Sequence, residues 1–455
     1  MMPAQHPGGV IWPRRVQGNI LTYRNNLAID DGTGIDLSYP GKPWTCPHGT
    51  QTGRRDMSGW EAKIDIRRVF LLQATRPKTF FGVGALAQLD GILREMAAAG
   101  QDRLLVVTDA VGYKASGAWN AILPMLSRHV AFEHYDGVRS NPTFANGEAA
   151  AKLGRELGAK AVLGIGGGSA IDTAKTAAAL LRHPIRKASD FYEKGVPISG
   201  ALPIVAVNTT HGSGSECDCF AAAQADGEDK PALRSPHLYP TYAIEDPSLT
   251  TSLPPRETLF TTLDALSHAL EAATAVTASP YSVVLGKEAV RLIAAYLPTA
   301  LAQPEHLAAR YWLLYASAIA GMSFDRGMLH VCHALEHAMS ALNADISHGE
   351  GLGILLPAVL REIYPAAPEA LAEVLEPIVP GLRGLPGEAT AAERGLREWF
   401  EAIGQPARMT TYFTGADVPA LTRMTLRSPL SRMLLPLAPL RVDAGVVERI
   451  FQRAL

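Results

Sequence analysis

The sequence predicts an α/β domain with a mostly parallel sheet, followed by an all-α domain. Apolar runs of strand length alternate with amphipathic helical stretches from about residue 69 to residue 207. A parallel strand is covered on both faces, so it reads as a continuous apolar run rather than an alternating one. A Pro- and Ser-rich stretch at 246–255 ends this pattern, and helical segments rich in Ala and Leu fill the remainder without convincing strands.

The elements of the α/β part follow one another at regular intervals. We expect strands at 69–72, 79–81, 104–108, 130–135, 161–165 and 202–207, and helices at 85–99, 119–127, 147–157 and 171–181. The change of character near 247–255 divides the chain into an α/β domain at 61–250 and an all-helical domain at 251–455. Residues 1–60 carry no apolar period and are predicted to be an irregular extension. That extension is a disordered arm, a partner-binding tail, or translation from an upstream start with Met57 as the true first residue.

Composition restricts the class of protein. The 455 residues suffice for two or three domains, and 47% hydrophobic residues indicate a compact globular fold. No apolar run approaches the roughly 18 residues of a membrane span. A net charge of −2 gives no electrostatic reason to expect nucleic acid. Four cysteines are too few for a disulfide framework, and no export signal follows the Arg pairs at 14–15 and 67–68, so we expect a cytoplasmic protein.

Two small-residue loops follow predicted strands. Gly166, Gly167, Gly168 and Ser169 come after the strand at 161–165 and open the next helix, and a second loop at 209–216 follows the strand at 202–207. Glycine lets backbone N–H groups approach a phosphate, and a helix N-terminus adds a positive field. Either loop alone is often only a tight turn. Together they predict a nucleotide across the carboxyl edge of the sheet.

Acid and imidazole side chains recur at helical spacing in the second half. Asp264 and His268 are four residues apart, as are His333 and His337, and His348 opens a Gly-rich turn. Such pairs share a helix face, and their apolar surroundings make them costly to bury unless something satisfies them. Nitrogen and carboxylate ligands from two helices suit a divalent transition metal. Spacing alone makes His337 as good a ligand as His333. We interpret the nearby His330 as a supporting or structural residue.

These motifs together resemble the iron-containing (group III) alcohol dehydrogenases, which have the dehydroquinate-synthase-like fold. The resemblance covers roughly residues 76–455. It is carried by segments 141–143, 166–175, 209–216, 264–268 and 333–357, which read NPT, GGGSAIDTAK, TTHGSGSE, DALSH and, at the start of the last, HALEH.

The resemblance implies a role for each matching residue. Metal ligands would be Asp264, His268, His333 and His348. His337 would be a catalytic residue beside the nicotinamide rather than a ligand. The pyrophosphate would lie on Gly167, Gly168 and Ser169, with Thr209, Thr210, Asn141 and Asp172 completing the cofactor site.

Asp109 follows the strand at 104–108, where this family places an acid near the adenine ribose. A carboxylate there accepts the 2′-hydroxyl and repels a 2′-phosphate, which favours NAD over NADP. The alternative is a turn or helix-capping Asp.

Three features depart from the family pattern. The interval from His337 to His348 is eleven residues where ten is usual, which predicts a loop one residue longer before the last ligand. Ala338 stands where Pro often follows. His211 replaces a small residue of the second loop, with Cys217 and Cys219 nearby, and we expect it to narrow or polarise the cofactor site.

The resemblance implies an enzyme that moves a hydride between a primary alcohol or diol and NAD, and that reduces an aldehyde in reverse. It implies Fe²⁺ as the metal, with Zn²⁺ as the alternative, and a homo-oligomer, dimeric or higher, without membrane or nucleic-acid partners. A maleylacetate-reductase-like enzyme would lack these ligands. Other hypotheses are a glycerol-dehydrogenase-like zinc enzyme, a non-redox metal-dependent hydrolase or lyase, and a non-catalytic scaffold.

Overall fold

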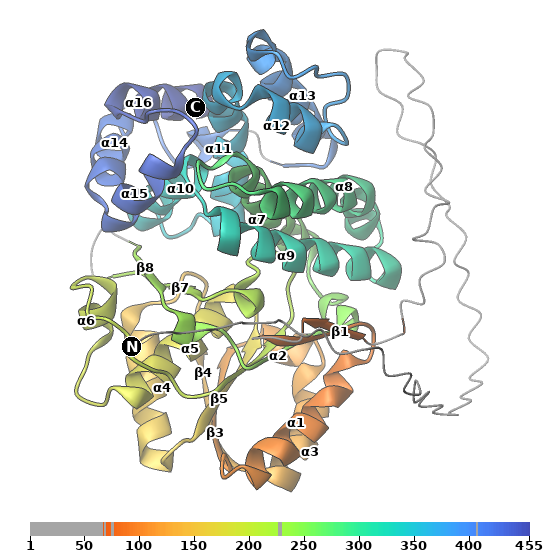
Figure 1. Cartoon of the computed structure of the whole chain (residues 1–455), viewed down its shortest axis with the longest axis vertical. Helices are drawn as coiled ribbons and strands as arrows, with labels where there is room; N and C mark the ends of the chain where they lie inside the picture. Colours follow the sequence, from red (N-terminus) through yellow and green to blue (C-terminus); the bar gives the residue numbers. More distant parts are fainter. Residues whose placement is uncertain (1–66, 68–69, 74–76, 226–229, 406–407) are drawn as a thin grey trace, which may run out of the picture. The chain divides into compact units, whose positions relative to one another are not determined.

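A seven-stranded sheet with helices on both faces forms the first half of the chain, and helices alone form the second (Figure 1). The computed structural model describes residues 67, 70–73, 77–225, 230–405 and 408–455. The predicted extension at 1–60 and the start at Met57 lie outside these residues. The expected fold class, an α/β part followed by an all-helical part, is confirmed.

The sheet has the strand order β1-β2-β9-β6-β5-β3-β4, in which only β1 is antiparallel to its neighbour. The seven strands are β1 Phe70–Gln73, β2 Lys78–Phe81, β3 Arg103–Asp109, β4 Ala131–Val138, β5 Ala161–Gly166, β6 Ile204–Asn208 and β9 Tyr242–Glu245. A two-stranded ribbon, β7 Phe220–Ala222 and β8 Ala232–Arg234, stands beside it. The six predicted strands are present within two or three residues of their expected ends. We expected no strand after 202–207, and this was wrong, because β9 follows at Tyr242–Glu245 and lies between β6 and β2.

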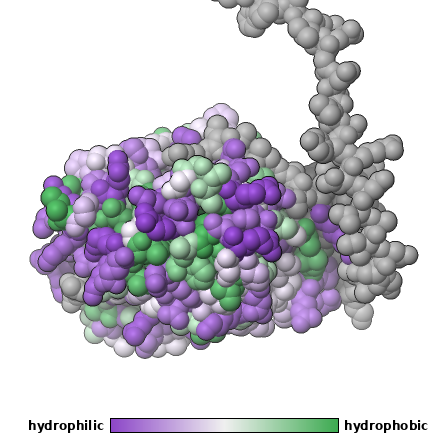
Figure 2. Space-filling model, turned by 90° about the horizontal axis from the view of Figure 1, so that it is seen from below, coloured by the Kyte–Doolittle hydropathy of each residue, from purple (hydrophilic) through white to green (hydrophobic). Residues whose placement is uncertain are grey.

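Helices cover the sheet through two separate apolar cores. The helices of this half are α1 Gln88–Ala98, α2 Gly112–Ala115, α3 Ala118–His129, α4 Phe144–Leu157, α5 Gly168–Arg182 and α6 Ala188–Tyr192. Alternate residues of β3 point to opposite faces. Leu105 and Val107 pack with α4 and α5, whereas Leu104 and Val106 pack with α1 and α3. Figure 2 shows a face of the molecule on which apolar residues lie in small groups among polar ones.

The second half contains ten α-helices within the described residues: α7 Pro255–Thr274, α8 Pro280–Ala302, α9 Leu307–Gly327, α10 Val331–Leu342, α11 His348–Ile363, α12 Pro368–Leu375, α13 Ala389–Ala402, α14 Val418–Arg427, α15 Pro429–Leu434 and α16 Ala444–Ala454. They share one apolar core, which Phe81 of β2 joins through an edge-on contact with Tyr311 of α9, 5.0 Å between ring centroids. The last strand ends at Glu245 and the first long helix begins at Pro255. Whether the halves are separate domains with a boundary at 250 stays a prediction.

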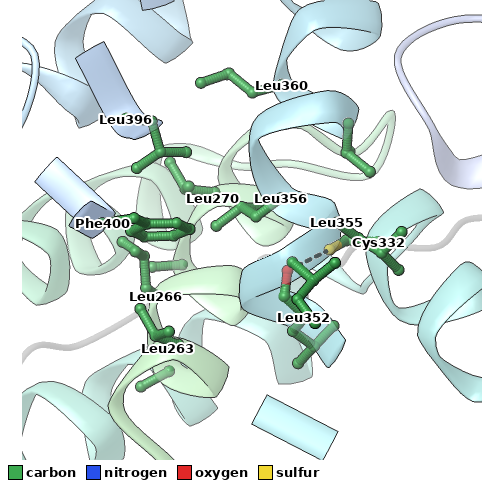
Figure 3. Packing of buried hydrophobic residues seen from close by; sticks show 14 of the residues in the cluster. Leu263, Leu266, Leu270, Cys332, Leu352, Leu355, Leu356, Leu360, Leu396 and Phe400 are labelled. Carbon is green, nitrogen blue, oxygen red and sulfur yellow. Dashed lines mark hydrogen bonds between the residues drawn. The ribbon is translucent and has the colours of Figure 1, made fainter. Parts of the chain in front are cut away.

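The core under α7, α10 and α11 fixes the helices that carry the His and Asp motifs. Leu263, Leu266 and Leu270 of α7 face leucines of α11, and Phe400 of α13 closes the cluster (Figure 3). The Cys332 thiol of α10 donates to the Leu352 carbonyl of α11 at 3.6 Å (Figure 3). A close-packed interior resists displacement, so the polar faces of these helices are held in place by their apolar ones.

Candidate active site

The side chains of Asp264, His268, His333 and His348 converge on one point. Helix α7 presents the first two, α10 presents His333, and His348 is the first residue of α11. From Asp264 Oδ1, the Nε2 atoms lie 3.1 Å away for His268, 3.5 Å for His333 and 3.7 Å for His348. His348 follows a loop at 343–347, between the end of α10 and the start of α11. That this loop is one residue longer than usual stays a prediction.

Two buried carboxylates orient the imidazoles of His333 and His348 through contacts with their Nδ1 atoms. His333 Nδ1 is 2.6 Å from Glu271 Oε2, and His348 Nδ1 contacts Glu336 Oε2. Burial alone would raise the pKa of Glu336, but the adjacent His348 and Lys230 lower it to about 2, so it stays ionised. An ionised carboxylate can only accept, so each Nδ1 carries the hydrogen. In the neutral form of each ring, Nε2 therefore directs a lone pair toward Asp264.

The cluster requires a positive charge at its centre. Asp264 Oδ1 and His333 Nε2 are buried and, among the described residues, have no hydrogen-bond partner. Lone pairs facing a carboxylate oxygen repel one another unless a cation lies between them. Burial lowers the pKa of His333, but the carboxylates of Asp264 and Glu271 outweigh burial and raise it to about 9. A proton or a divalent metal can supply the charge. One carboxylate and three imidazoles are a donor set that fits Fe²⁺ or Zn²⁺.

His337 lies one turn beyond His333 on α10, with its ring centroid 5.4 Å from that of His348. Its Nδ1 is 2.8 Å from the Lys230 backbone carbonyl, which can only accept, so Nδ1 carries the hydrogen and Nε2 the lone pair. Burial, with help from the Lys230 charge, holds the pKa of His337 well below its usual value. His337 is thus a neutral imidazole with a basic nitrogen left over.

All thirteen predicted site residues line one cavity of about 570 Å³ between the carboxyl edge of the sheet and the helical half. They are Asp109, Asn141, Gly167, Gly168, Ser169, Asp172, Thr209, Thr210, Asp264, His268, His333, His337 and His348. The metal-ligand cluster and both small-residue loops therefore open into the same space.

The two loops pack so closely that the positions of Gly167 and Gly168 have no room for a side chain. Gly167 caps the N-terminus of α5, where a Cβ would lie 2.8 Å from Thr210, and a Cβ on Gly168 would lie 2.7 Å from Ser213. Gly166 has φ 147°, which an L side chain rarely adopts. The first N–H groups of α5 have no partner within the helix, so they present a site for an anion.

Three of the predicted cofactor residues also hold the protein together. Asp109 Oδ1 accepts from the backbone N–H groups of Val111, at 2.7 Å, and Gly112, so it is a turn residue as well as a cavity residue. Asn141 Oδ1 accepts from Lys230 Nζ at 2.8 Å. Asp172 accepts from Ser215 Oγ at 2.6 Å and from the Ala222 N–H at 2.8 Å. Both oxygens of Asp172 are occupied by the protein, so it can serve the cofactor by fixing the second loop.

His211 does not enter the cavity, and our expectation that it narrows or polarises the cofactor site was wrong. It is fully buried, and its Nε2 accepts from Arg310 Nη1 at 2.9 Å. Its Nδ1 lies 3.0 Å from Thr262 Oγ1.

The His330 ring contacts the side chains of Glu271 and Thr274. These contacts agree with its interpretation as a supporting residue.

The sequence interpretation missed Glu271, Glu336 and Lys230. Glu336 lies within the HALEH motif, three residues after His333. That helical spacing could have suggested Glu336 as a residue of the site. Lys230 carried no local signal, because its role depends on contacts with Asn141, which is 89 positions earlier, and with His337, which is 107 positions later.

Two family models match the chain: "Iron-containing alcohol dehydrogenase" at residues 76–247, and "Fe-containing alcohol dehydrogenase family, C-terminal" at residues 258–425. The chain belongs to the iron-containing alcohol dehydrogenase family. It is an oxidoreductase of the alcohol dehydrogenase class, and membership implies a bound metal and NAD(H). The family and the enzyme class expected from the sequence are thereby confirmed.

Individual relatives align over nearly their whole length. The long-chain primary alcohol dehydrogenase AdhA of Thermoanaerobacter ethanolicus is 47% identical over 399 residues, which are 87% of this chain and 100% of that protein. A crystal structure of 1,3-propanediol oxidoreductase has a TM-score of 0.76 at 28% identity and covers 84% of this chain and 99% of its own. Sulfoacetaldehyde reductase of Bifidobacterium kashiwanohense in complex with NAD⁺ has a TM-score of 0.72 at 25% identity and covers 84% and 98%. None of the described helices is both long and apolar enough to cross a membrane.

Proposed function

We propose that this alcohol dehydrogenase moves a hydride between a primary alcohol and NAD, and that it reduces the corresponding aldehyde in the reverse direction. The observation that carries the proposal is the convergence of three imidazole Nε2 atoms within 3.7 Å of one buried Asp264 oxygen. This cluster lines the same cavity as the phosphate-binding loops. A metal and a dinucleotide can therefore act on one substrate.

Asp264, His268, His333 and His348 would hold the metal. A bound divalent ion would supply the positive charge that lowers the pKa of an alcohol hydroxyl. We infer Fe²⁺ from the family, with Zn²⁺ as the alternative, because the same donor set favours zinc on affinity alone. Glu271 and Glu336 fix the ring orientation of His333 and His348 through their Nδ1 hydrogens.

Gly167, Gly168 and Ser169 would bind the pyrophosphate with the N–H groups of α5, and Thr209, Thr210 and Asn141 would complete the cofactor site. A bound NAD⁺ would supply the hydride acceptor. Asp109 would favour NAD over NADP by repelling a 2′-phosphate. The NAD⁺ in the related sulfoacetaldehyde reductase supports this cofactor.

His337 would act on the proton of the substrate. Its Nδ1 hydrogen is engaged by the Lys230 carbonyl, and the cavity is lined by its ring, so Nε2 is the atom that can accept a hydrogen bond or relay a proton. Its lowered pKa keeps this nitrogen unprotonated at neutral pH.

The substrate class follows from two relatives that act on primary alcohols or diols. AdhA is named for long-chain primary alcohols and the solved relative for 1,3-propanediol. We also propose a cytoplasmic homo-oligomer. The three described cysteines are buried and free, which suits a reducing compartment, and light scattering would give the oligomeric state.

The deciding experiment combines metal analysis of anaerobically purified protein with NAD⁺ and NADP⁺ reduction on a panel of primary alcohols and diols. One equivalent of iron and NAD⁺-dependent oxidation are expected. Zinc in place of iron, together with oxidation of diols in preference to primary alcohols, would indicate a glycerol-dehydrogenase-like enzyme. A metal-replete protein that binds neither dinucleotide would favour a non-redox hydrolase or lyase.

A further inference from the structure

An apolar wall borders the ligand cluster on the side of α9 and α15. It consists of six side chains that line the cavity: Phe324, Met328, Leu329, Leu430, Met433 and Leu434. We call these six residues the alkyl wall. It starts at the metal ligands, because the Phe324 ring centroid is 4.5 Å from that of His268.

The α15 part of the wall is anchored to the helix that carries His333. Ser431 Oγ donates to the Ala334 carbonyl of α10 at 3.4 Å. Positions 430, 433 and 434 share one face of α15, so Leu430, Met433 and Leu434 line the cavity together. Leu430 and Leu434 are buried, whereas Met433 is 41% exposed. The apolar surface therefore runs from the buried ligands to solvent.

The α9 part of the wall is held in an unusual backbone conformation. Met328 ends α9 with φ 72°, and its N–H donates to the Phe324 carbonyl at 2.7 Å. Thr277 Oγ1 donates to the Gly327 carbonyl at 2.6 Å. A Cβ on Gly327 would lie within 2.4 Å of the Ala272 carbonyl, so the close approach of α9 to α7 requires glycine. Met328 and Leu329 are thus fixed beside the ligands.

We propose that the alkyl wall binds the unbranched hydrocarbon chain of a primary alcohol, with the hydroxyl at the Asp264 cluster and the chain directed toward Met433. The inference rests on the proposed function and assigns the residues that set chain-length specificity. None of the six side chains carries a charge or a strong hydrogen-bonding group. The wall therefore makes few favourable contacts with a short or polyhydroxylated alcohol. Each methylene moved from water onto it should raise kcat/KM about fourfold, ~0.8 kcal/mol.

The test is a chain-length series of primary alcohols, from ethanol upward, on the wild-type enzyme and on Met433→Glu. The exposed position tolerates a charge without unfolding. In the wild type, kcat/KM should rise with each methylene and level off once the chain reaches solvent. Met433→Glu should lower the ratio of kcat/KM for the alcohols at the plateau to kcat/KM for ethanol at least about tenfold.

Leu342→Glu is the matched control, because Leu342 is 37% exposed and lies at the end of α10 outside the cavity lining. It should leave the whole series unchanged. A flat wild-type series, or equal effects of Met433→Glu on ethanol and long alcohols, would overturn the alkyl wall while leaving the dehydrogenase intact.

Calorimetric binding of 1-octanol and ethanol to both variants and the wild type separates the two proposals. If the wild-type enzyme oxidised no alcohol but bound 1-octanol more tightly than ethanol, the proposed reaction would be refuted and the alkyl wall would stand. Binding of 1-octanol no tighter than that of ethanol would refute the alkyl wall even in the absence of turnover.

Discussion

At the scale of single residues, hydrogen-bond partners distinguish His333 and His348 from His337. His333 and His348 receive carboxylates on Nδ1 and turn Nε2 toward Asp264, whereas His337 receives a backbone carbonyl. A carboxylate makes the ring a stronger ligand, because it balances the positive charge that a metal induces. A neutral carbonyl leaves His337 a weaker donor that is suited to proton transfer.

We therefore expect His268→Ala and His333→Ala to lose bound metal and alcohol oxidation together. His337→Ala should keep its metal and lose turnover by on the order of 100-fold. Elemental analysis beside steady-state kinetics measures both quantities. A metal-depleted His337→Ala protein beside a metal-replete His348→Ala protein would exchange the roles of those two residues.

In the proposed function Asp109 favours NAD over NADP, and in the structure it also holds a turn. Because its Oδ1 accepts from two backbone N–H groups, removal of the whole side chain would disturb the turn. Asp109→Asn keeps an accepting oxygen and removes the charge. The ratio of kcat/KM for NADP⁺ to that for NAD⁺ should rise about tenfold, worth ~1.4 kcal/mol. An unchanged ratio in Asp109→Asn would make Asp109 a turn residue only.

At the scale of elements, the start of α11 is positioned by contact with the backbone of α7. A Cβ on Gly349 would overlap the Phe260 carbonyl, so only glycine lets α11 begin where His348 reaches Asp264. Gly349→Ala should push α11 away and weaken metal binding at least about tenfold in a chelator competition. Gly387→Ala is the control, since no atom lies within 4 Å of its Cβ position. Equal metal affinity in both variants would contradict this account.

The loop after β6 and the end of β9 share a buried acid pair. Glu216 and Glu245 are fully buried, and Glu216 Oε2 and Glu245 Oε1 have no hydrogen-bond partner among the described residues. Burial raises the pKa of both carboxyls above the usual 4.5, and for Glu245 the neighbouring Glu216 adds to the rise. Lys175 opposes the rise at Glu216 only in part.

A carboxyl with a raised pKa binds more protons when folded than when unfolded. Its contribution to stability is complete below pH 4.5 and is lost as pH rises through the folded-state pKa. We expect the free energy of unfolding to fall from pH 5 to pH 9, and to fall less in Glu245→Gln. Denaturant titrations at several pH values test this, with exposed Glu398→Gln as the control. If the free energy of unfolding of Glu245→Gln fell with pH as steeply as that of the wild type, the acid pair would not be the cause of the fall.

At the scale of the whole molecule, the site exists only where the two halves meet. Phosphate-binding loops come from the carboxyl edge of the sheet, and metal ligands come from α7, α10 and α11. Lys230 contacts both sides, through Asn141 of the sheet half and His337 of the helical half. Substrate and cofactor can therefore meet in one cavity closed by both halves.

The extension predicted at 1–60 is tested by a protein that starts at Met57. The alignment with AdhA covers 100% of that relative and 87% of this chain, so part of this chain has no counterpart in that relative. We expect the shortened protein to keep its free energy of unfolding and its kcat/KM. Insoluble or inactive protein would show that the segment stabilises the fold or an oligomer interface.

Local pattern by itself determined the alternation of six strands and four helices, both glycine loops and the pairs Asp264–His268 and His333–His337. Periodicity and glycine are local properties, so the printed sequence carries them. Tertiary structure alone decided that β9 enters the sheet between β2 and β6, because strand order depends on distant pairing. It also decided that His211 turns to Arg310, and that Glu271, Glu336 and Lys230 orient the imidazoles. A side chain's partner depends on which distant groups are buried with it, and sequence spacing does not record that proximity.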